Sequence, residues 1–171
     1  MTGQVHIGPA QTAADIAAVA TLFAAYAASL DFDLGYQDFA TELATLPGKY
    51  APPSGALLVA RHDGAPVGCV ALRPLEPGIC EMKRLFVTPA GRGLGVGRAL
   101  IAAVLAEAAR IGHREMRLDT FPSMEGALAL YLQAGFQTVA PYYPSPMPNT
   151  VFLARSLIAD GHCPNSADGV D

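Results

Sequence analysis

A glycine-rich loop that carries a basic residue is the segment of this sequence best suited to bind an anion. Residues 91–97 read Gly-Arg-Gly-Leu-Gly-Val-Gly, and an apolar, strand-like run ends shortly before them at Val87. From Arg98 onward, apolar residues recur at helical spacing, and Gly112 stands where the helix would end. Glycines leave the backbone open to close approach, and the free N–H groups of a helix N-terminus attract negative charge. The segment therefore predicts a phosphate-binding turn between a strand and a helix.

The register of the glycines excludes two common nucleotide-binding loops. The pattern G-x-G-x-x-G would require its third glycine at Val96 or Arg98, and the chain contains no Gly-Lys-Ser or Gly-Lys-Thr triplet of a P-loop. What the loop does contain is Arg92-x-x-Gly95-x-Gly97. For so short a motif, the alternative is a glycine turn that merely leads into a structural helix.

A second motif follows downstream, and the two together resemble the GNAT superfamily of N-acetyltransferases. Residues 127–136 read Ala-Leu-Ala-Leu-Tyr-Leu-Gln-Ala-Gly-Phe, which is similar to the family signature A-x-x-L-Y-x-x-x-G-F, and the first loop is similar to R/Q-x-x-G-x-G/A. The resemblance covers residues 56–157 and implies acetyl-CoA as co-substrate, with no metal. It also implies that the pyrophosphate is gripped by the loop and the helix start, namely Arg92, Gly93, Leu94, Gly95, Val96, Gly97 and Arg98.

Amide formation from a thioester requires a neutral amine and a proton acceptor. An alkyl amine with a pKa of about 10 is mostly ammonium at neutral pH, so reaching the neutral form costs about 4 kcal/mol. A carboxylate can accept the proton. Glu81 is the candidate base, because it precedes Arg92 by the eleven residues at which histone acetyltransferases of the superfamily place their catalytic glutamate. The alternative is a strand glutamate paired with Lys83, which shares its face if no bulge intervenes.

Tyr131, in the second motif, is the candidate acid by resemblance, because in the family this tyrosine protonates the departing thiolate. A phenol of pKa about 10 stays protonated at neutral pH and can donate to a thiolate of pKa about 8.5. The alternative is an aromatic side chain that only packs on the sheet. The resemblance further implies that the backbone N–H of Leu85 or Phe86 polarises the thioester carbonyl and that Val87 pairs with the pantetheine arm. Met124 stands where many relatives have an asparagine that binds the pantetheine.

A mixed α/β sheet is needed to position these residues. Three strands joined by short turns, over residues 56–60, 67–72 and 79–87, predict an antiparallel meander that ends at the glycine loop. A strand at 116–119 follows the long helix by a right-handed crossover and is therefore parallel to its predecessor. The expectation is six or seven strands with about four helices. The other elements are a strand around Val5 and Ile7, a helix capped by Thr12, helices at 39–46 and 124–133, and strands at 136–139 and 151–157.

Length and charge bound the classes of function. The 171 residues, with a net charge of −4, indicate one domain over residues 1–158, and we expect residues 159–171 to be a disordered tail. The acidic total argues against a nucleic-acid partner, yet seven of the eleven basic residues lie between Glu81 and Arg117, which suits a small polyanion. No membrane span or signal peptide is evident, and the three cysteines lack metal-ligand spacing. We therefore expect a cytoplasmic protein with reduced thiols.

These observations predict an enzyme that transfers the acetyl group of acetyl-CoA directly to a primary amine of a small molecule. The acceptor should contact residues 31–50, the turn at Arg73 and the loop at Tyr142–Tyr143. A cationic amine would be attracted by three acids, unless these are only solvated helix-end residues: Asp31, Asp33 and Asp38. Three alternatives stay open, namely a protein N-terminus or lysine as acceptor, a non-catalytic acyl-CoA sensor, and another acyl donor such as succinyl- or propionyl-CoA. The oligomeric state is also open, a homodimer included.

Overall fold

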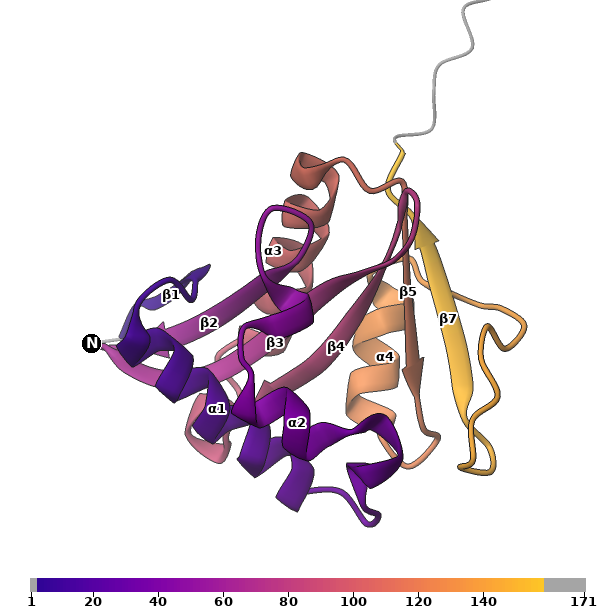
Figure 1. The fold of residues 1–171 in the computed structure, drawn as a ribbon. Helices are drawn as coiled ribbons and strands as arrows, with labels where there is room; N and C mark the ends of the chain where they lie inside the picture. Colours follow the sequence, from indigo (N-terminus) through magenta and orange to yellow (C-terminus); the bar gives the residue numbers. More distant parts are fainter. Residues whose placement is uncertain (1–2, 159–171) are drawn as a thin grey trace, which may run out of the picture.

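The computed structural model describes residues 3–158, which form a seven-stranded mixed sheet flanked by helices (Figure 1). The strand order is β1-β2-β3-β4-β5-β7-β6. Strands β4 and β5 run parallel, as predicted for two strands joined by a crossover helix, and the other neighbouring pairs are antiparallel. The predicted tail, residues 159–171, lies outside the described residues.

The elements follow the chain in the expected alternation. The strands are β1 (Val5–Pro9), β2 (Ala56–His62), β3 (Ala65–Glu76), β4 (Ile79–Val87), β5 (Glu115–Thr120), β6 (Gln137–Thr138) and β7 (Val151–Ser156). The α-helices are α1 (Ala13–Ala28), α2 (Phe39–Ala44), α3 (Val96–Ile111) and α4 (Glu125–Gln133). Short 3-10 turns lie at Leu34–Gln37, Gly48–Tyr50 and Pro89–Gly91.

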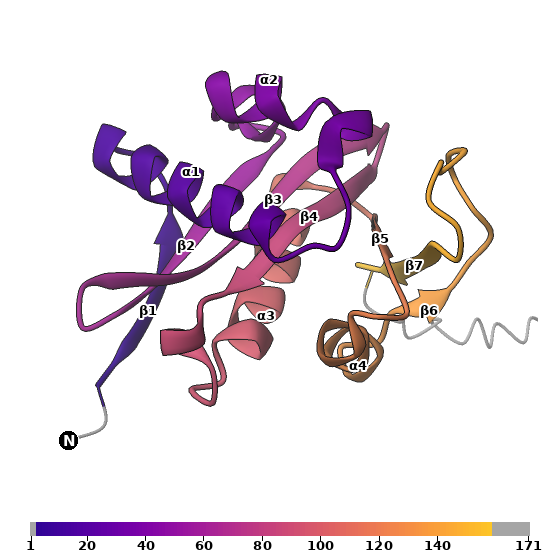
Figure 2. The same ribbon diagram turned by 90° about the horizontal axis from the view of Figure 1, so that it is seen from below.

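Helices cover both faces of the sheet, with α1 and α2 on one side and α3 and α4 on the other (Figure 2). The apolar stripe of α1, which includes Val19 and Phe23, packs on Ala71 of β3. The stripe of α3, which includes Leu100, packs in a second cluster with the next residue of β3, Leu72. Since side chains alternate along a strand, β3 contributes to both layers of the core. None of the helices within residues 3–158 combines the length and the apolar composition needed to cross a membrane.

Strands β4 and β5 separate after a short paired stretch, and this separation positions the site. Their pairing runs from Ile79–Glu115 to Glu81–Arg117, although β4 continues to Val87 and β5 to Thr120. Figure 1 shows the two strands diverging from that point. The second half of β4 therefore presents its backbone to the space between the two strands, where an extended ligand can pair with it as a further strand would.

The predicted meander, the two motif helices and the Thr12 cap of the first helix are confirmed. Several boundaries differ by a few residues, and the differences at α3 and β3 bear on the site. Helix α3 begins at Val96, two residues before the predicted start at Arg98. The Val96 side chain is buried in the core, and this burial draws the end of the glycine loop into the first helical turn. Strand β3 continues to Glu76 beyond its predicted end at Leu72, because it pairs with β4 over that length.

Candidate active site

The glycine loop and the start of α3 form a cradle of backbone amides. Gly93 and Gly95 have φ angles of 79° and 73°, a left-handed backbone that glycine adopts without strain. The first bond of the helix joins Ala99 N–H to the Gly95 carbonyl oxygen at 3.1 Å. The amides of Val96 and Gly97 precede that bond, so they belong to the N–H groups that a helix N-terminus leaves for an anion. The loop thus fits the pyrophosphate of a coenzyme A derivative.

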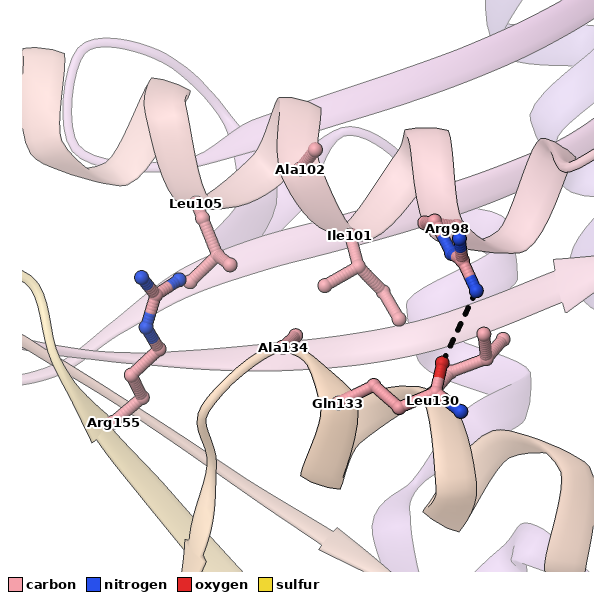
Figure 3. Close-up of a pocket in the computed structure, with 8 residues that line it drawn as sticks. All are labelled: Arg98, Ile101, Ala102, Leu105, Leu130, Gln133, Ala134 and Arg155. Atoms are coloured by element: carbon pink, nitrogen blue, oxygen red, sulfur yellow. Dashed lines mark hydrogen bonds between the residues drawn. The ribbon is translucent and has the colours of Figure 1, made fainter.

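The two arginines of the predicted cradle lie differently. Arg92 is exposed beside the loop. The Arg98 guanidinium instead reaches across to α4, where its Nη2 donates to Gln133 Oε1 at 3.2 Å (Figure 3). It lines a groove of about 590 Å³ between α3 and α4 that also contains Arg155. The side chain of predicted residue Leu94 is exposed, so both it and Arg98 belong to the cradle through their backbone.

A β-bulge interrupts β4 next to the open space between β4 and β5. Val70 of β3 stands opposite two residues of β4, Arg84 and Leu85, where the register shifts. Arg84 has a φ of 60°, a left-handed conformation that costs a non-glycine residue about 1–3 kcal/mol. Such strain persists only where the surroundings hold it in place, and bulges re-aim the residues that follow them.

The contacts of the Arg84 side chain stabilise this strained conformation. Its Nε donates to Glu42 Oε2 at 2.9 Å and its Nη2 to Glu42 Oε1 at 3.3 Å, and both side chains are almost completely buried. Tyr50 OH donates to the same carboxylate at 2.8 Å, and the Phe39 ring lies 5.1 Å from the guanidinium. Burial alone would raise the pKa of Glu42, but Arg84, Tyr50 and Lys49 together outweigh it and keep that pKa below its ordinary value. A buried, charged hydrogen-bonded cluster therefore fixes the bulge.

The bulge reverses which face each later residue of β4 presents. Met82 packs in the cluster under α3, and so do Leu85 and Val87, whereas Phe86 packs on the α1 side. Without the extra residue, Leu85 would share the α1 side with Lys83. Of the predicted oxyanion donors, Leu85 therefore lies on the side of α3 and α4, next to the open space between the strands, and Phe86 turns its side chain away.

Tyr131 and Leu85 line the same narrow cavity. This cavity of about 30 Å³ lies between β4, β5 and α4 and also contains Asp119 and Met124. The Tyr131 ring is buried and packs edge-on against Phe136, with centroids 6.0 Å apart. No hydrogen bond within residues 3–158 involves its hydroxyl, and burial raises its pKa well above the ordinary value. The phenol is thus protonated and has its donor available inside the cavity.

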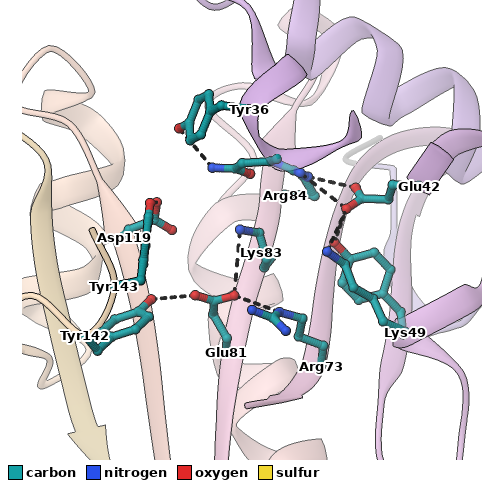
Figure 4. A network of polar contacts seen from close by, with 12 residues as sticks. Tyr36, Glu42, Lys49, Arg73, Glu81, Lys83, Arg84, Asp119, Tyr142 and Tyr143 are labelled. Carbon is teal, nitrogen blue, oxygen red and sulfur yellow. Dashed lines mark hydrogen bonds and ion pairs between the residues drawn. The ribbon is translucent and has the colours of Figure 1, made fainter. Parts of the chain in front are cut away.

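Glu81 lines a second, larger cavity of about 310 Å³ on the α1 side of the sheet (Figure 4). Its side chain is 1% exposed and meets three donors: Arg73 Nε at 2.8 Å, Tyr142 OH at 2.6 Å and, as an ion pair, Lys83 Nζ at 3.7 Å. Burial by itself raises the pKa of Glu81, but Lys83, Tyr142 and Arg73 together outweigh it and hold the pKa below its ordinary value. The alternative of an ion pair with Lys83 is therefore present in the structure, and Glu81 also faces a cavity, so its role as a base stays a prediction.

Lys83 lies where the two cavities meet, since it lines both. Neither Lys83 nor Asp119 was predicted as a site residue, because neither belongs to a motif. For Lys83, the available signal was a basic residue in a strand that is otherwise mostly apolar. This signal identifies a site residue only when the bulge in β4 is known. On β5, Asp119 accepts a hydrogen bond from Tyr143 OH at 2.6 Å and so ties the Tyr142–Tyr143 loop to the site.

Two of the three acids proposed to attract an amine are engaged in local turns. Asp33 Oδ1 accepts from the Gly35 amide at 2.6 Å, and Asp38 Oδ1 accepts from Thr41 Oγ1 at 2.9 Å. These contacts are those of helix-end acids. The larger cavity is lined instead by Tyr36, Lys49, Arg73 and the 142–146 segment. These residues fall in or next to the regions predicted to contact an acceptor, and that contact stays a prediction.

Comparison with known proteins agrees with this geometry. The model of the acetyltransferase (GNAT) family matches residues 19–136. An uncharacterised N-acetyltransferase of Schizosaccharomyces pombe is 41% identical over 134 residues, covering 77% of this chain and 82% of its own. A Klebsiella pneumoniae structure described as an acyl-CoA N-acyltransferase superposes with a TM-score of 0.67 at 30% identity, over 91% of this chain and 98% of its own.

A third match is a structure that contains a cofactor. A Salmonella typhimurium protein described as an acetyltransferase, solved with its cofactor acetyl-CoA, has a TM-score of 0.65 at 20% identity, over 95% of this chain and 98% of its own. At that identity the likeness concerns the fold alone. The family match spans the second half of α1, the meander, the glycine loop and the Tyr131 helix. The matched range includes all residues that line the narrow cavity, whereas the 142–146 segment of the larger cavity lies beyond the match. The chain belongs to the GNAT family of acetyltransferases.

Proposed function

We propose that this protein transfers the acetyl group of acetyl-CoA to the primary amine of a small molecule. The observation that carries the proposal is the pair of cavities that meet at Lys83. One contains Tyr131 and the bulge residue Leu85, and the other contains Glu81. An acyl donor held at the α3 cradle and along β4 would enter the first, and an amine in the second would approach from the opposite face of the sheet.

When bound, acetyl-CoA supplies an activated acyl group whose carbonyl becomes an oxyanion as the amine attacks. The amide of Leu85, a residue that follows the bulge and lines the narrow cavity, is the donor that stabilises this oxyanion. Glu81 accepts the proton of the attacking nitrogen, whose N–H becomes more acidic as the C–N bond forms, so a carboxylate of low pKa suffices. Tyr131 donates its phenolic proton to the departing sulfur, whose basicity is raised by the same burial that raises the pKa of the phenol.

The walls of the larger cavity support a small acceptor. Tyr142, Tyr143, Pro144 and Pro146 line it together with residues of β3 and β4. The loop is fixed there, because Tyr142 OH is bonded to Glu81 and Tyr143 OH to Asp119. A protein substrate needs a groove that admits an extended chain, so a loop bonded across the cavity favours a compact ligand.

A non-catalytic acyl-CoA sensor is the second candidate, and a different acyl donor is a variant of the first. A sensor would have no use for a carboxylate and a phenol with opposite pKa shifts on the two sides of one strand, and this pairing favours catalysis.

The test is a screen with free thiol release as the readout. Purified protein and acetyl-CoA are offered small primary amines and, in parallel, peptides with a free N-terminus or lysine. Turnover above the rate of thioester hydrolysis is expected with small amines. Turnover with peptides alone would reassign the acceptor class, and acetyl-CoA binding without turnover on any acceptor would favour the sensor. Repeating the screen with propionyl- and succinyl-CoA defines the acyl group.

A further inference from the structure

The larger cavity is lined by more positive than negative charge. Its charged residues are Lys49, Arg73 and Lys83 against the single acid Glu81. A site that binds only a cationic amine is expected to contain more negative than positive residues, because like charges repel strongly in a confined, poorly solvated space. The excess of positive charge therefore indicates that the ligand carries an anionic group.

Lys83 is the residue that this argument depends on most. Its side chain is 9% exposed, and its Nζ lies 3.7 Å from Glu81 Oε1, beyond hydrogen-bond distance. None of the hydrogen bonds within residues 3–158 uses its three donors. Burial lowers the pKa of Lys83, while Glu81 and Asp119 counteract that effect. A nearly buried ammonium without hydrogen bonds, at the junction of the two cavities, is a site prepared for an acceptor atom of a ligand.

Arg73 and Lys49 extend the cationic lining toward the opening of the cavity. The Nε of Arg73 is engaged with Glu81, so its terminal nitrogens carry the remaining donors of a side chain that is about one-third exposed. Lys49 Nζ lies 3.3 Å from Glu42 Oε1 and is exposed at the rim. Glu42 is also the partner of Arg84, so its single charge is shared between two cations.

We propose that the acceptor amine also carries a carboxylate, as an amino acid does, and that Lys83 and Arg73 bind this carboxylate while Glu81 faces the amino group. The inference rests on the proposed function and narrows its substrate class. An amino acid presents both signs of charge within a few bonds, and the cavity presents both signs within the reach of one residue: Glu81 between Arg73 and Lys83. Charge-assisted hydrogen bonds to a guanidinium and an ammonium would fix the orientation of such an acceptor.

The experiment uses matched acceptors that differ only in the carboxylate. Free amino acids are compared with the amines that correspond to them without it, such as phenylalanine with phenethylamine and histidine with histamine, with thiol release from acetyl-CoA as the readout. We expect kcat/KM to be at least about tenfold higher for the carboxylate member of the preferred pair. Equal or better turnover of the amines would overturn the inference and leave the proposed function intact.

A variant of Lys83 tests whether this residue causes the preference for acceptors with a carboxylate. Lys83→Met keeps an unbranched side chain of similar length and removes the charge, so the ratio of kcat/KM between the members of the pair should fall by about ten- to hundredfold. Arg110→Gln, an equally charge-removing change at the far end of α3, should keep the wild-type ratio. An unchanged ratio in folded Lys83→Met would contradict the assignment.

Binding separates failure of the inference from failure of the proposed function. Amino acids are titrated calorimetrically into the protein saturated with coenzyme A. If no amine is acetylated but an amino acid binds the wild type and not Lys83→Met, the carboxylate site stands and the catalytic proposal fails. If neither member of any pair binds or reacts, the carboxylate site is rejected.

Discussion

The two residues proposed as base and acid have opposite pKa shifts. Glu81 is held ionised by the cations and the phenol around it, and Tyr131 is held protonated by burial. They lie on the two sides of β4, one in the larger cavity and one in the narrow one. Because a base must be ionised and an acid protonated at the working pH, these protonation states are compatible with the roles proposed for the two residues.

Tyr131→Phe removes one oxygen and keeps the ring that packs against Phe136. If the phenol protonates the leaving sulfur, turnover should fall by about 10²–10³-fold, with acetyl-CoA affinity and Tm nearly unchanged. Steady-state kinetics with the best acceptor of the screen provides the measurement. A folded variant that keeps more than half of the wild-type turnover would remove Tyr131 from the proton transfer and leave it as a core aromatic.

Glu81→Gln keeps the shape of the side chain and removes its charge. At neutral pH the rate should fall, because no carboxylate remains to accept the amine proton, and the loss should shrink as pH rises and the amine loses its proton to solvent. The wild-type carboxylate has a lowered pKa and stays ionised over this whole range, so its own titration does not contribute to the slope. The pH–rate profiles of the two proteins are compared, and parallel profiles would show that Glu81 is not the base.

At the scale of elements, the bulge in β4 lies between a buried charge pair and the backbone of the proposed active site. The strained Arg84 places Leu85 beside the narrow cavity, and the Arg84–Glu42 pair anchors the bulge to α2. The 3-10 turn at Gly48–Tyr50 adds a hydrogen bond to Glu42 through Tyr50. The short helix α2 therefore supports, through Glu42 and Arg84, the bulge that precedes the proposed oxyanion donor Leu85.

Glu42→Gln tests that connection. Removing one member of a buried charge pair leaves the other uncompensated, so the free energy of unfolding should fall by about 3–5 kcal/mol at neutral pH. Since the folded pKa of Glu42 is lowered, its stabilisation is present above the unfolded pKa and is lost as pH falls through the folded value. Urea unfolding at several pH values should therefore show the gap between wild type and variant closing in acid.

The control for this prediction is the same substitution in an exposed pair. Glu107 is bonded to Arg110 on the surface of α3, and surface pairs contribute little to stability. Glu107→Gln should leave the urea midpoint close to that of the wild type. If Glu42→Gln were equally silent, the buried pair would not be what holds the bulge.

At the scale of the whole molecule, the parts that the sequence predicted are those encoded locally. The glycine loop and Tyr131 stand in contiguous motifs, and hydrophobic periodicity located the meander and the helices around them. Of the neighbours of Glu81, Lys83 was found because it lies two residues away on the same strand. Contact with Tyr142 could not be found in this way, because Tyr142 lies 61 residues further along the chain. The bulge was hidden as well, since the apolar run at 85–87 fits a strand with either face inward.

The last prediction concerns the stability that a ligand at the cradle gives to the whole fold. Acetyl-CoA at about 100 times its Kd stabilises a protein that binds it only when folded by about 2.7 kcal/mol. For a chain of this size the wild-type Tm should then rise by about 5–11 °C. Arg92→Gln removes an exposed charge beside the cradle and should weaken binding about tenfold. At the same ligand concentration the stabilisation then falls to about 1.4 kcal/mol, half of the wild-type shift.

Arg110→Gln is the matched control, because it removes the same charge from the opposite end of α3 and should retain the full shift. Thermal unfolding of the three proteins with and without acetyl-CoA gives the comparison, and the unliganded Tm values show whether either change affects the fold itself. A full shift in Arg92→Gln would mean that the backbone amides bind the pyrophosphate without this side chain. If the Tm of the wild type did not rise, acetyl-CoA would be excluded as the ligand. The cradle exists only in the folded protein, so a ligand that binds there must stabilise the folded state.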